Sequence, residues 1–216
     1  MNFTTVGLNK SQLTVLQQAG AWLTLRNFYL AGGTALAIYF GHRKSVDLDW
    51  FTAEKIPDPL ILAQQLRDDG LQFETSQTAP GTLYGLVAGV RMSFIEFRYP
   101  FLQPLQTWEK TGTCLASVDD LACMKLAAIA QRGSRKDFYD VHTLLARHRR
   151  LNELLALYQQ KFQVSQRSCF GNTPKDENLF LTFRSSCVSF VFTGSSEDRE
   201  GRSIFITATS ARYYTG

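Results

Sequence analysis

Apolar and polar residues alternate along the chain in a way that predicts strands and helices in turn. Residues 28–31 form a short apolar run that ends at two glycines, and the apolar run 34–40 is rich in alanine. These runs predict a buried strand followed by a helix. Residues 45–51 alternate in polarity, which indicates a strand with one buried face. Asp58 before Pro59 predicts a helix start, because Asp accepts free N–H groups and Pro fits the first turn.

A hairpin is predicted over residues 82–97, with its turn near residues 88–89. From Ser117 onward the pattern becomes helical, and Ser117 with an acid three residues later is typical of a helix N-cap. A last helix is expected over roughly residues 152–163. This order of elements predicts an α/β fold, with a mixed sheet and helices followed by a helical segment.

Composition divides the 216 residues into three expected parts. An α/β core is expected over 1–115, a helical segment over 116–165 and an atypical tail, rich in Ser and Thr, over 166–216. Apolar residues make up 44% of the chain, which is enough for a packed core. There is no apolar run of about 18 residues that would predict a membrane span. The N-terminus does not resemble a signal peptide, so a cytoplasmic protein is expected.

The net charge and the cysteine content exclude few classes of function. The net charge of +4 permits a nucleotide or nucleic-acid partner without requiring one. The four cysteines form no CxxC pair and lie in no Cys/His cluster, so a zinc site is not expected.

Two carboxylates, Asp47 and Asp49, stand two residues apart on the predicted strand 45–51. Side chains at this spacing point to the same face of a strand. Like charges held together cost free energy unless a cation lies between them. Mg²⁺ prefers oxygen ligands and phosphate partners. The spacing therefore fits a Mg²⁺ site, although a surface turn with two solvated acids has the same pattern.

A glycine pair precedes these acids in the stretch AGGTAL, residues 31–36. Gly32 and Gly33 would let the backbone approach a phosphate, and the following helix would offer its N-terminal N–H groups to an anion. Thr34 could add a hydroxyl group. A tight turn between a strand and a helix would explain the same glycines.

Basic residues 42–44 lie between the glycines and the acids, and Ser45 shares the face of Asp47. A cation here, such as Arg43, could bind a triphosphate, or could pair with Asp47 and Asp49 in the absence of metal. A solvated basic loop is the other interpretation.

The helical segment holds a second group of charges. Lys125 lies within an otherwise apolar helix, where a lysine is costly unless it reaches a partner or a cleft. Asp137 and Asp140 are three residues apart and therefore neighbours on a helix. An ordinary charged helix face would also account for these residues.

Together, the stretches FYLAGGTALAIYFGHRKSVDLDWF and MKLAAIAQRGSRKDFYDVHTLL resemble the AbiEii-type nucleotidyltransferase toxins of abortive-infection, type IV toxin–antitoxin systems. The resemblance covers about residues 10–163 and implies a polymerase-β-like nucleotidyltransferase fold, in which the glycine turn, the acidic strand and a helix-borne lysine surround one cleft. The residues implied at that cleft are Gly32, Gly33 and Ser45 at the triphosphate, Asp47 and Asp49 on Mg²⁺, Lys125 at the phosphates and Asp140 as the acid of the last motif.

The resemblance also implies an activity and partners. The enzyme would transfer a nucleoside monophosphate from an NTP to an acceptor, which in some members is the 3′ end of tRNA, and an AbiEi-type antitoxin would be its partner. The alternative is a catalytically silent member of the same fold that binds a nucleotide or the antitoxin.

The chain departs from the pattern of related enzymes at two places. Many nucleotidyltransferases carry a third carboxylate on a neighbouring strand, where this sequence offers Ser93 near the expected position and Glu96 farther along. The resemblance ends at about Ser165, so the tail is either a divergent ending or the product of a shifted reading frame.

Overall fold

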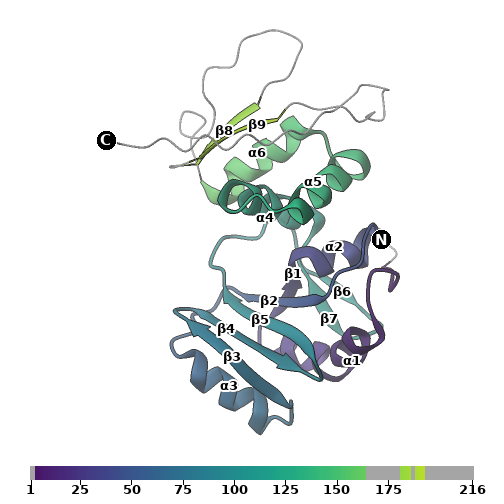
Figure 1. Cartoon of the computed structure of the whole chain (residues 1–216), viewed down its shortest axis with the longest axis vertical. Helices are drawn as coiled ribbons and strands as arrows, with labels where there is room; N and C mark the ends of the chain where they lie inside the picture. The colour runs from purple at the N-terminus through teal and green to yellow at the C-terminus, as the bar shows by residue number, and fades with distance from the viewer. Residues whose placement is uncertain (1–2, 164–180, 186–187, 193–216) are drawn as a thin grey trace. The chain divides into compact units, whose positions relative to one another are not determined.

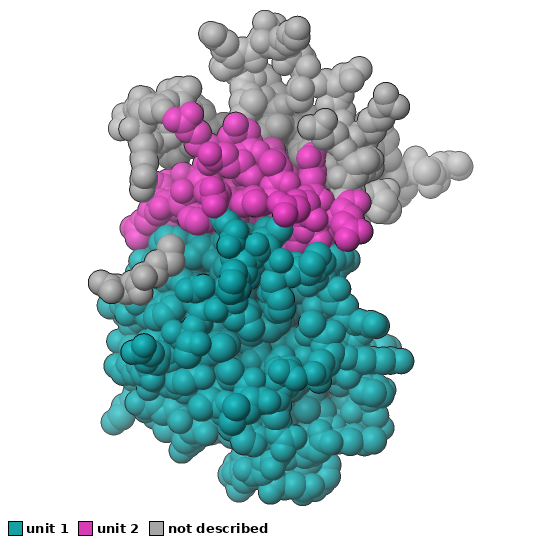
Figure 2. Space-filling model, turned by 180° about the vertical axis from the view of Figure 1, so that it is seen from behind, with its two compact units in different colours: residues 1–121 teal, residues 122–216 magenta. Residues whose placement is uncertain are grey.

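The structure is a computed structural model of the chain, and it describes residues 3–163, 181–185 and 188–192. The chain divides into two compact units, residues 1–121 and 122–216 (Figure 2). In the described part of the chain, no helix is long and apolar enough to cross a membrane.

The first unit contains a seven-stranded mixed sheet with helices (Figure 1). Its strands are β1 (Tyr29–Ala31), β2 (Asp47–Thr52), β3 (Phe73–Ala79), β4 (Thr82–Val87), β5 (Val90–Glu96), β6 (Gln106–Trp108) and β7 (Thr113–Leu115). Its helices are α1 (Lys10–Leu25), α2 (Gly32–Phe40), α3 (Pro59–Asp68) and the first turn of α4 (Val118–Gln131).

The strands lie in the order β3-β4-β5-β2-β1-β7-β6. Strand β2 pairs in parallel with β5 and antiparallel with β1, and β1 pairs in parallel with β7. The prediction of an α/β fold with a mixed sheet is therefore confirmed. This order places β2 near the middle of the sheet, directly beside β5.

One face of the sheet forms the core of this unit. Leu48 and Trp50 of β2 have no exposed surface, and Met92 and Phe94 pair with them in register on β5 and are also buried. Helices α1 and α3 contact the strands of the sheet. Because side chains alternate along a strand, the opposite face carries the odd-numbered residues of β2, which are only half-buried.

Local sequence signals explain where elements begin and turn. The Asp58 side chain accepts a hydrogen bond from Leu60 N at 2.8 Å, so the predicted start of α3 is confirmed. Ala88 and Gly89 both have positive φ, 48° and 75°, which is the geometry of a two-residue hairpin turn between β4 and β5. At the start of α4, Ser117 Oγ accepts from Asp120 N at 3.1 Å, as the N-cap pattern predicted.

The second unit consists of the rest of α4, then α5 (Arg135–Arg147), α6 (Leu151–Phe162) and the strands β8 (Leu181–Ser185) and β9 (Val188–Phe192). Strands β8 and β9 pair antiparallel. The helical segment expected from Ser117 onward is therefore observed. The tail predicted over 166–216 lies largely outside the described residues.

Candidate active site

The two acids of β2 lie on one face, as their spacing predicted, and both are held by β5. In the parallel register, Asp47 faces Arg91 and Asp49 faces Ser93. Arg91 Nε donates to Asp47 Oδ1 at 2.7 Å, and Ser93 Oγ donates to Asp49 Oδ1 at 2.5 Å. The side chain of Asp47 remains 28% exposed. Both carboxylates are therefore oriented by their neighbours and face a partly open surface.

The glycine turn lies directly against this acidic pair. Strand β1 pairs with β2 so that Ala31 faces Asp49, and Gly32 follows with a φ of 68°. A Cβ atom at Gly32 would lie 2.5 Å from Asp49 Oδ2, too close for any real side chain. Glycine is therefore required here both for its left-handed conformation and for its approach to the carboxylate.

The next glycine lies beneath the segment that precedes β2. A Cβ atom at Gly33 would lie 2.3 Å from a guanidinium nitrogen of Arg43 and 3.5 Å from Ser45 Oγ. The buried Thr34 hydroxyl lies 2.7 Å from Ser45 Oγ and also contacts the carbonyl oxygen of Asp47. The structure thus brings together all five residues that were predicted to bind the nucleotide.

The start of helix α2 has the chemistry to bind an anion. Ala31 at the N-cap provides no side-chain hydrogen bond to the first turn. The N-terminal N–H groups of a helix carry a partial positive charge and favour phosphate oxygens. With Arg43 and Ser45 beside Gly33, this end of α2 is suited to bind phosphate groups next to the two carboxylates.

The donor set fits Mg²⁺. Mg²⁺ is usually bound by one or two carboxylates, with substrate phosphates and waters completing its six ligands. Asp47 and Asp49 supply two carboxylates on one face, and within residues 3–163 no group of three or more His, Cys, Asp or Glu side chains could hold a metal. The site therefore resembles a metal site that depends on its substrate for the remaining ligands.

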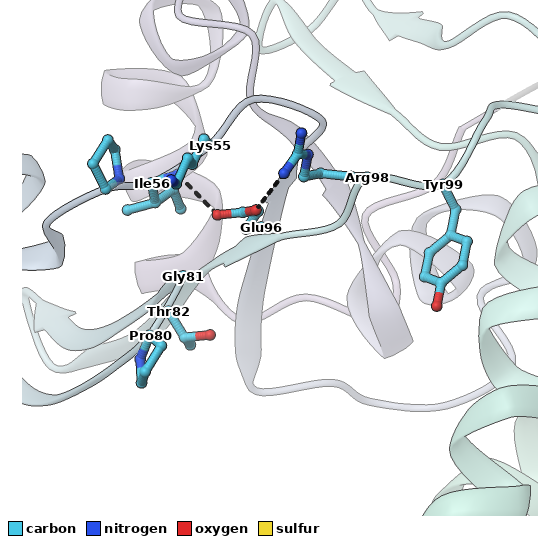
Figure 3. A pocket seen from close by; sticks show the side chains of 9 residues that line it. Lys55, Ile56, Pro80, Gly81, Thr82, Glu96, Arg98 and Tyr99 are labelled. Atoms are coloured by element: carbon cyan, nitrogen blue, oxygen red, sulfur yellow. Dashed lines mark hydrogen bonds and ion pairs between the residues drawn. The ribbon is translucent and has the colours of Figure 1, made fainter.

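Glu96, the other candidate for a third carboxylate, lies apart from the acidic pair. It faces Thr52 in register, three residues beyond the pair of Asp49 and Ser93, and so belongs to the opposite face of the sheet. Its carboxylate accepts from Ile56 N at 3.0 Å and lies 3.6 Å from Arg98 (Figure 3). Ser93, not Glu96, stands beside Asp49.

The second unit contains a buried cluster of charges that joins α4 to α5. Lys125 is 4% exposed, and its Nζ lies 3.0 Å from Asp137 Oδ1 and 2.8 Å from Asp140 Oδ2. Arg132 donates two hydrogen bonds to Asp137, and Ser134 donates one. The lysine within the apolar helix thus reaches two partners. Lys125 and Asp140, predicted as site residues, are in direct contact with each other.

The pKa of Asp137 follows from these contacts. Burial by itself would raise the pKa of this carboxyl group. The hydrogen bonds from Arg132 and Ser134, together with the charge of Lys125, outweigh burial and hold the pKa of Asp137 well below its usual range. The group is therefore ionised at neutral pH.

Two comparisons decide the family of the chain. The model of a family described as "Nucleotidyl transferase AbiEii toxin, Type IV TA system" matches residues 24–107 and 96–186. An uncharacterized protein of Aquifex aeolicus is 40% identical over 158 residues, which are 72% of this chain and 76% of that protein. The chain belongs to the AbiEii nucleotidyltransferase toxin family. It is therefore a nucleotidyltransferase, as the sequence predicted.

Solved structures with the same fold include other nucleotidyltransferases. The antibiotic-resistance factor ANT(2″)-Ia matches with a TM-score of 0.55 and 11% identity, over 72% of this chain and 93% of that one. MenT4, a nucleotidyltransferase toxin of Mycobacterium tuberculosis, matches with a TM-score of 0.50 and 18% identity, over 78% and 68% of the two chains. These likenesses confirm the nucleotidyltransferase fold.

The family match corrects one expectation from the sequence. It extends to residue 186, whereas the resemblance was expected to end at about Ser165. Part of the Ser/Thr-rich tail therefore belongs to the AbiEii pattern, including the whole of β8.

Sequence reasoning missed one cation that contacts the acidic pair. The basic residues 42–44 were considered as partners for Asp47 and Asp49, but the ion pair of Asp47 that the structure shows is with Arg91. The signal was present in the alternating stretch 90–97. Recognising Arg91 as the partner of Asp47 requires the parallel register of β2 and β5, which a single sequence does not provide.

Proposed function

We propose that this AbiEii-family protein is a Mg²⁺-dependent toxin that transfers a nucleoside monophosphate from an NTP to an acceptor. The observation that carries the proposal is the contact between the glycine turn and the acidic pair, with Gly32 against the carboxylate of Asp49. This contact brings the start of α2 beside two carboxylates, which supports a phosphate site next to a Mg²⁺ site. Phosphoryl transfer depends mostly on such positioning and charge neutralisation.

Different residues of the chain bind the metal and the triphosphate. Asp47 and Asp49 hold Mg²⁺, while Gly33, Arg43 and Ser45 bind the triphosphate at the start of α2. When bound, Mg²⁺ neutralises charge at the reacting phosphate and assists the attacking hydroxyl group. The acceptor oxygen forms a bond to the α-phosphorus as the bond from that phosphorus to the pyrophosphate oxygen breaks.

The buried charge cluster has a proposed part in the reaction as well. The AbiEii family relationship supports a role for Lys125 at the nucleotide phosphates and a catalytic role for Asp140 as the acidic residue of the last motif. The contacts of Lys125 with Asp137 and Asp140 fix the lysine side chain in one position.

The proposed partners follow from the family. The acceptor is an RNA, with the 3′ end of tRNA as the first candidate, and an AbiEi-type antitoxin would restrain the enzyme. Cytoplasmic action fits both partners.

A second candidate is a catalytically silent protein that binds a nucleotide or the antitoxin. Two contacts from β5 favour this candidate. Ser93 stands beside Asp49 in place of a third carboxylate, and Arg91 neutralises Asp47.

The test is transfer of label from an α-labelled NTP to total RNA with Mg²⁺. We expect transfer by the wild-type chain, and loss of transfer after chelation of the metal or in Asp47→Asn and Asp49→Asn. Glu109→Gln, which removes an exposed acid elsewhere in the first unit, is the matched control and should retain transfer. NTP binding with no transfer to any acceptor would instead support the silent protein.

A further inference from the structure

A cavity of about 550 Å³ lies in the first unit, at the ends of β2 and β5 that follow the acidic pair (Figure 3). Lys55, Arg98 and Tyr99 line it together with the turn 80–82 between β3 and β4. The nucleotidyl-transfer site described above uses none of these residues. The cavity nevertheless lies on the same two strands as Asp49 and Ser93, a few residues farther along each.

The cavity is suited to an anion. It is lined by two cations, Lys55 and Arg98, and by one carboxylate, that of Glu96. This carboxylate already accepts a hydrogen bond from Ile56 N, and its ion pair with Arg98 is long at 3.6 Å. Within the described residues, the ammonium group of Lys55 has no ion-pair partner, and the Arg98 side chain is 64% exposed. Both cations can therefore contact a phosphate group from solvent.

A row of aromatic rings leads from the acidic pair to this cavity. Phe51 follows Asp49 on the same face of β2 and contacts Phe97 edge to face, with ring centres 5.7 Å apart. Phe97 in turn contacts Tyr99, with centres 4.9 Å apart. Tyr99 is 46% exposed and lines the cavity beside Arg98. Figure 3 shows the Tyr99 ring turned away from Lys55 and the Arg98 guanidinium group, so a ligand that used all three side chains would place a flat base and a phosphate in separate parts of the cavity.

These features identify the ligand by its chemistry. Single-stranded nucleic acids bind surfaces that combine basic side chains for the backbone with aromatic rings for the bases. Phe51 lies about 7 Å along β2 from Asp49, so the row begins beside the reacting groups. A nucleic-acid strand whose end reached Asp49 would pass along this row as far as Tyr99, at the border of the cavity. A polycationic acceptor would be repelled by Lys55 and Arg98.

We propose that the cavity binds a single-stranded nucleic acid near its acceptor end, with one phosphate on Lys55 and Arg98 and one base on Tyr99. This inference rests on the proposed nucleotidyl transfer, and it assigns a binding site to the acceptor.

The experiment measures binding apart from catalysis. A fluorescently labelled single-stranded oligoribonucleotide is titrated with the full chain in the absence of NTP, and NTP binding is measured separately by calorimetry with Mg²⁺. Tyr99→Ala should weaken oligonucleotide binding about tenfold, whereas Tyr99→Phe should preserve it, since a base stacks on either ring. NTP binding should be the same in all three proteins, which also shows that the variants fold.

Charge is tested with a double variant. Lys55→Gln with Arg98→Gln should weaken oligonucleotide binding and reduce the slope of log affinity against log salt by about 0.7, because both cations bind one phosphate and each neutralised phosphate of a single strand contributes about 0.7. Lys10→Gln with Lys110→Gln removes the same charge from exposed positions elsewhere in the first unit and should leave the slope nearly unchanged.

The proposal is overturned if the wild-type chain binds no oligonucleotide, or if the cavity variants bind it as the wild-type chain does. It is also overturned if Tyr99→Ala loses NTP binding and retains oligonucleotide binding, because the cavity would then hold the incoming nucleotide. None of these results depends on transfer, so the proposed function is judged separately by the loss of labelling in Asp47→Asn.

Discussion

Arg91 donates from Nε to Asp47 Oδ1 at 2.7 Å, between two residues that face each other across the parallel strands β5 and β2. The guanidinium group thus occupies one side of a carboxylate that is proposed to hold Mg²⁺. The Arg91 side chain is 68% exposed. Because exposed ion pairs are weak, a divalent cation can displace this contact.

Replacing Arg91 tests this competition. Arg91→Gln removes the competing cation, so we expect the chain without NTP to bind Mn²⁺ or Mg²⁺ about 1.4- to fivefold more tightly, the range set by a surface ion pair of roughly 0.2–1 kcal/mol. Isothermal titration calorimetry or the electron paramagnetic resonance signal of free Mn²⁺ would measure it. Arg67→Gln removes an equal charge from α3 and should leave metal affinity almost unchanged. Equal affinities in Arg91→Gln and the wild-type chain would contradict the competition.

The contact of Gly32 with Asp49 gives a second prediction. Gly32→Ala places a methyl group against the carboxylate and forces alanine into a left-handed conformation, which costs about 1–2 kcal/mol by itself. We expect loss of metal binding in addition to this loss of stability. Gly89→Ala is the matched control, because Gly89 also has a positive φ but a Cβ atom there meets nothing within 4 Å. Both variants should unfold at lower urea, but retained metal affinity in Gly32→Ala would refute the steric argument.

Much of the fold could be predicted because it depends on local signals. The N-cap at Asp58, the hairpin turn at 88–89 and the helix after Ser117 are each specified by residues within a few positions of one another. Strands β6 and β7 were not predicted. Each has three residues, and β7 is held by its pairing with β1, where Leu30 faces Leu115, far away in the sequence.

In the candidate site, too, local features could be predicted from the sequence and features that depend on tertiary pairing could not. Asp47 and Asp49 could be predicted to share a face because strand periodicity fixes that relation. The choice between Ser93 and Glu96 could not be made, because it depends on the register of β5 against β2. The two acidic partners of Lys125 likewise depend on how α4 packs against α5. The sequence alone therefore could not determine the features of the site that depend on strand register or helix packing.

The buried lysine predicts a large loss of stability. Lys125→Met leaves Asp137 and Asp140 buried without one of their cations, and breaking a buried ion pair typically costs about 3–5 kcal/mol. Lys136→Met, on the exposed side of α5, should change stability little. Urea denaturation followed by circular dichroism compares the two. If Lys125→Met were as stable as the wild-type chain and yet inactive in transfer, a catalytic role for Lys125 would be favoured over a structural one.

The lowered pKa of Asp137 predicts how stability depends on pH. In the unfolded chain this group titrates near the usual value for Asp, about 3.9, and in the folded chain it titrates at a lower pH. The unfolded state therefore binds the proton first, and the stabilisation from Asp137 is complete above this value and is lost as the pH falls below it. Denaturation from pH 7 to pH 3 should show this loss in the wild-type chain. Asp137→Asn should be less stable at pH 7 and should lose less stability on acidification. An equal decline in both proteins would show that the ion pairs of Asp137 do not set the acid sensitivity.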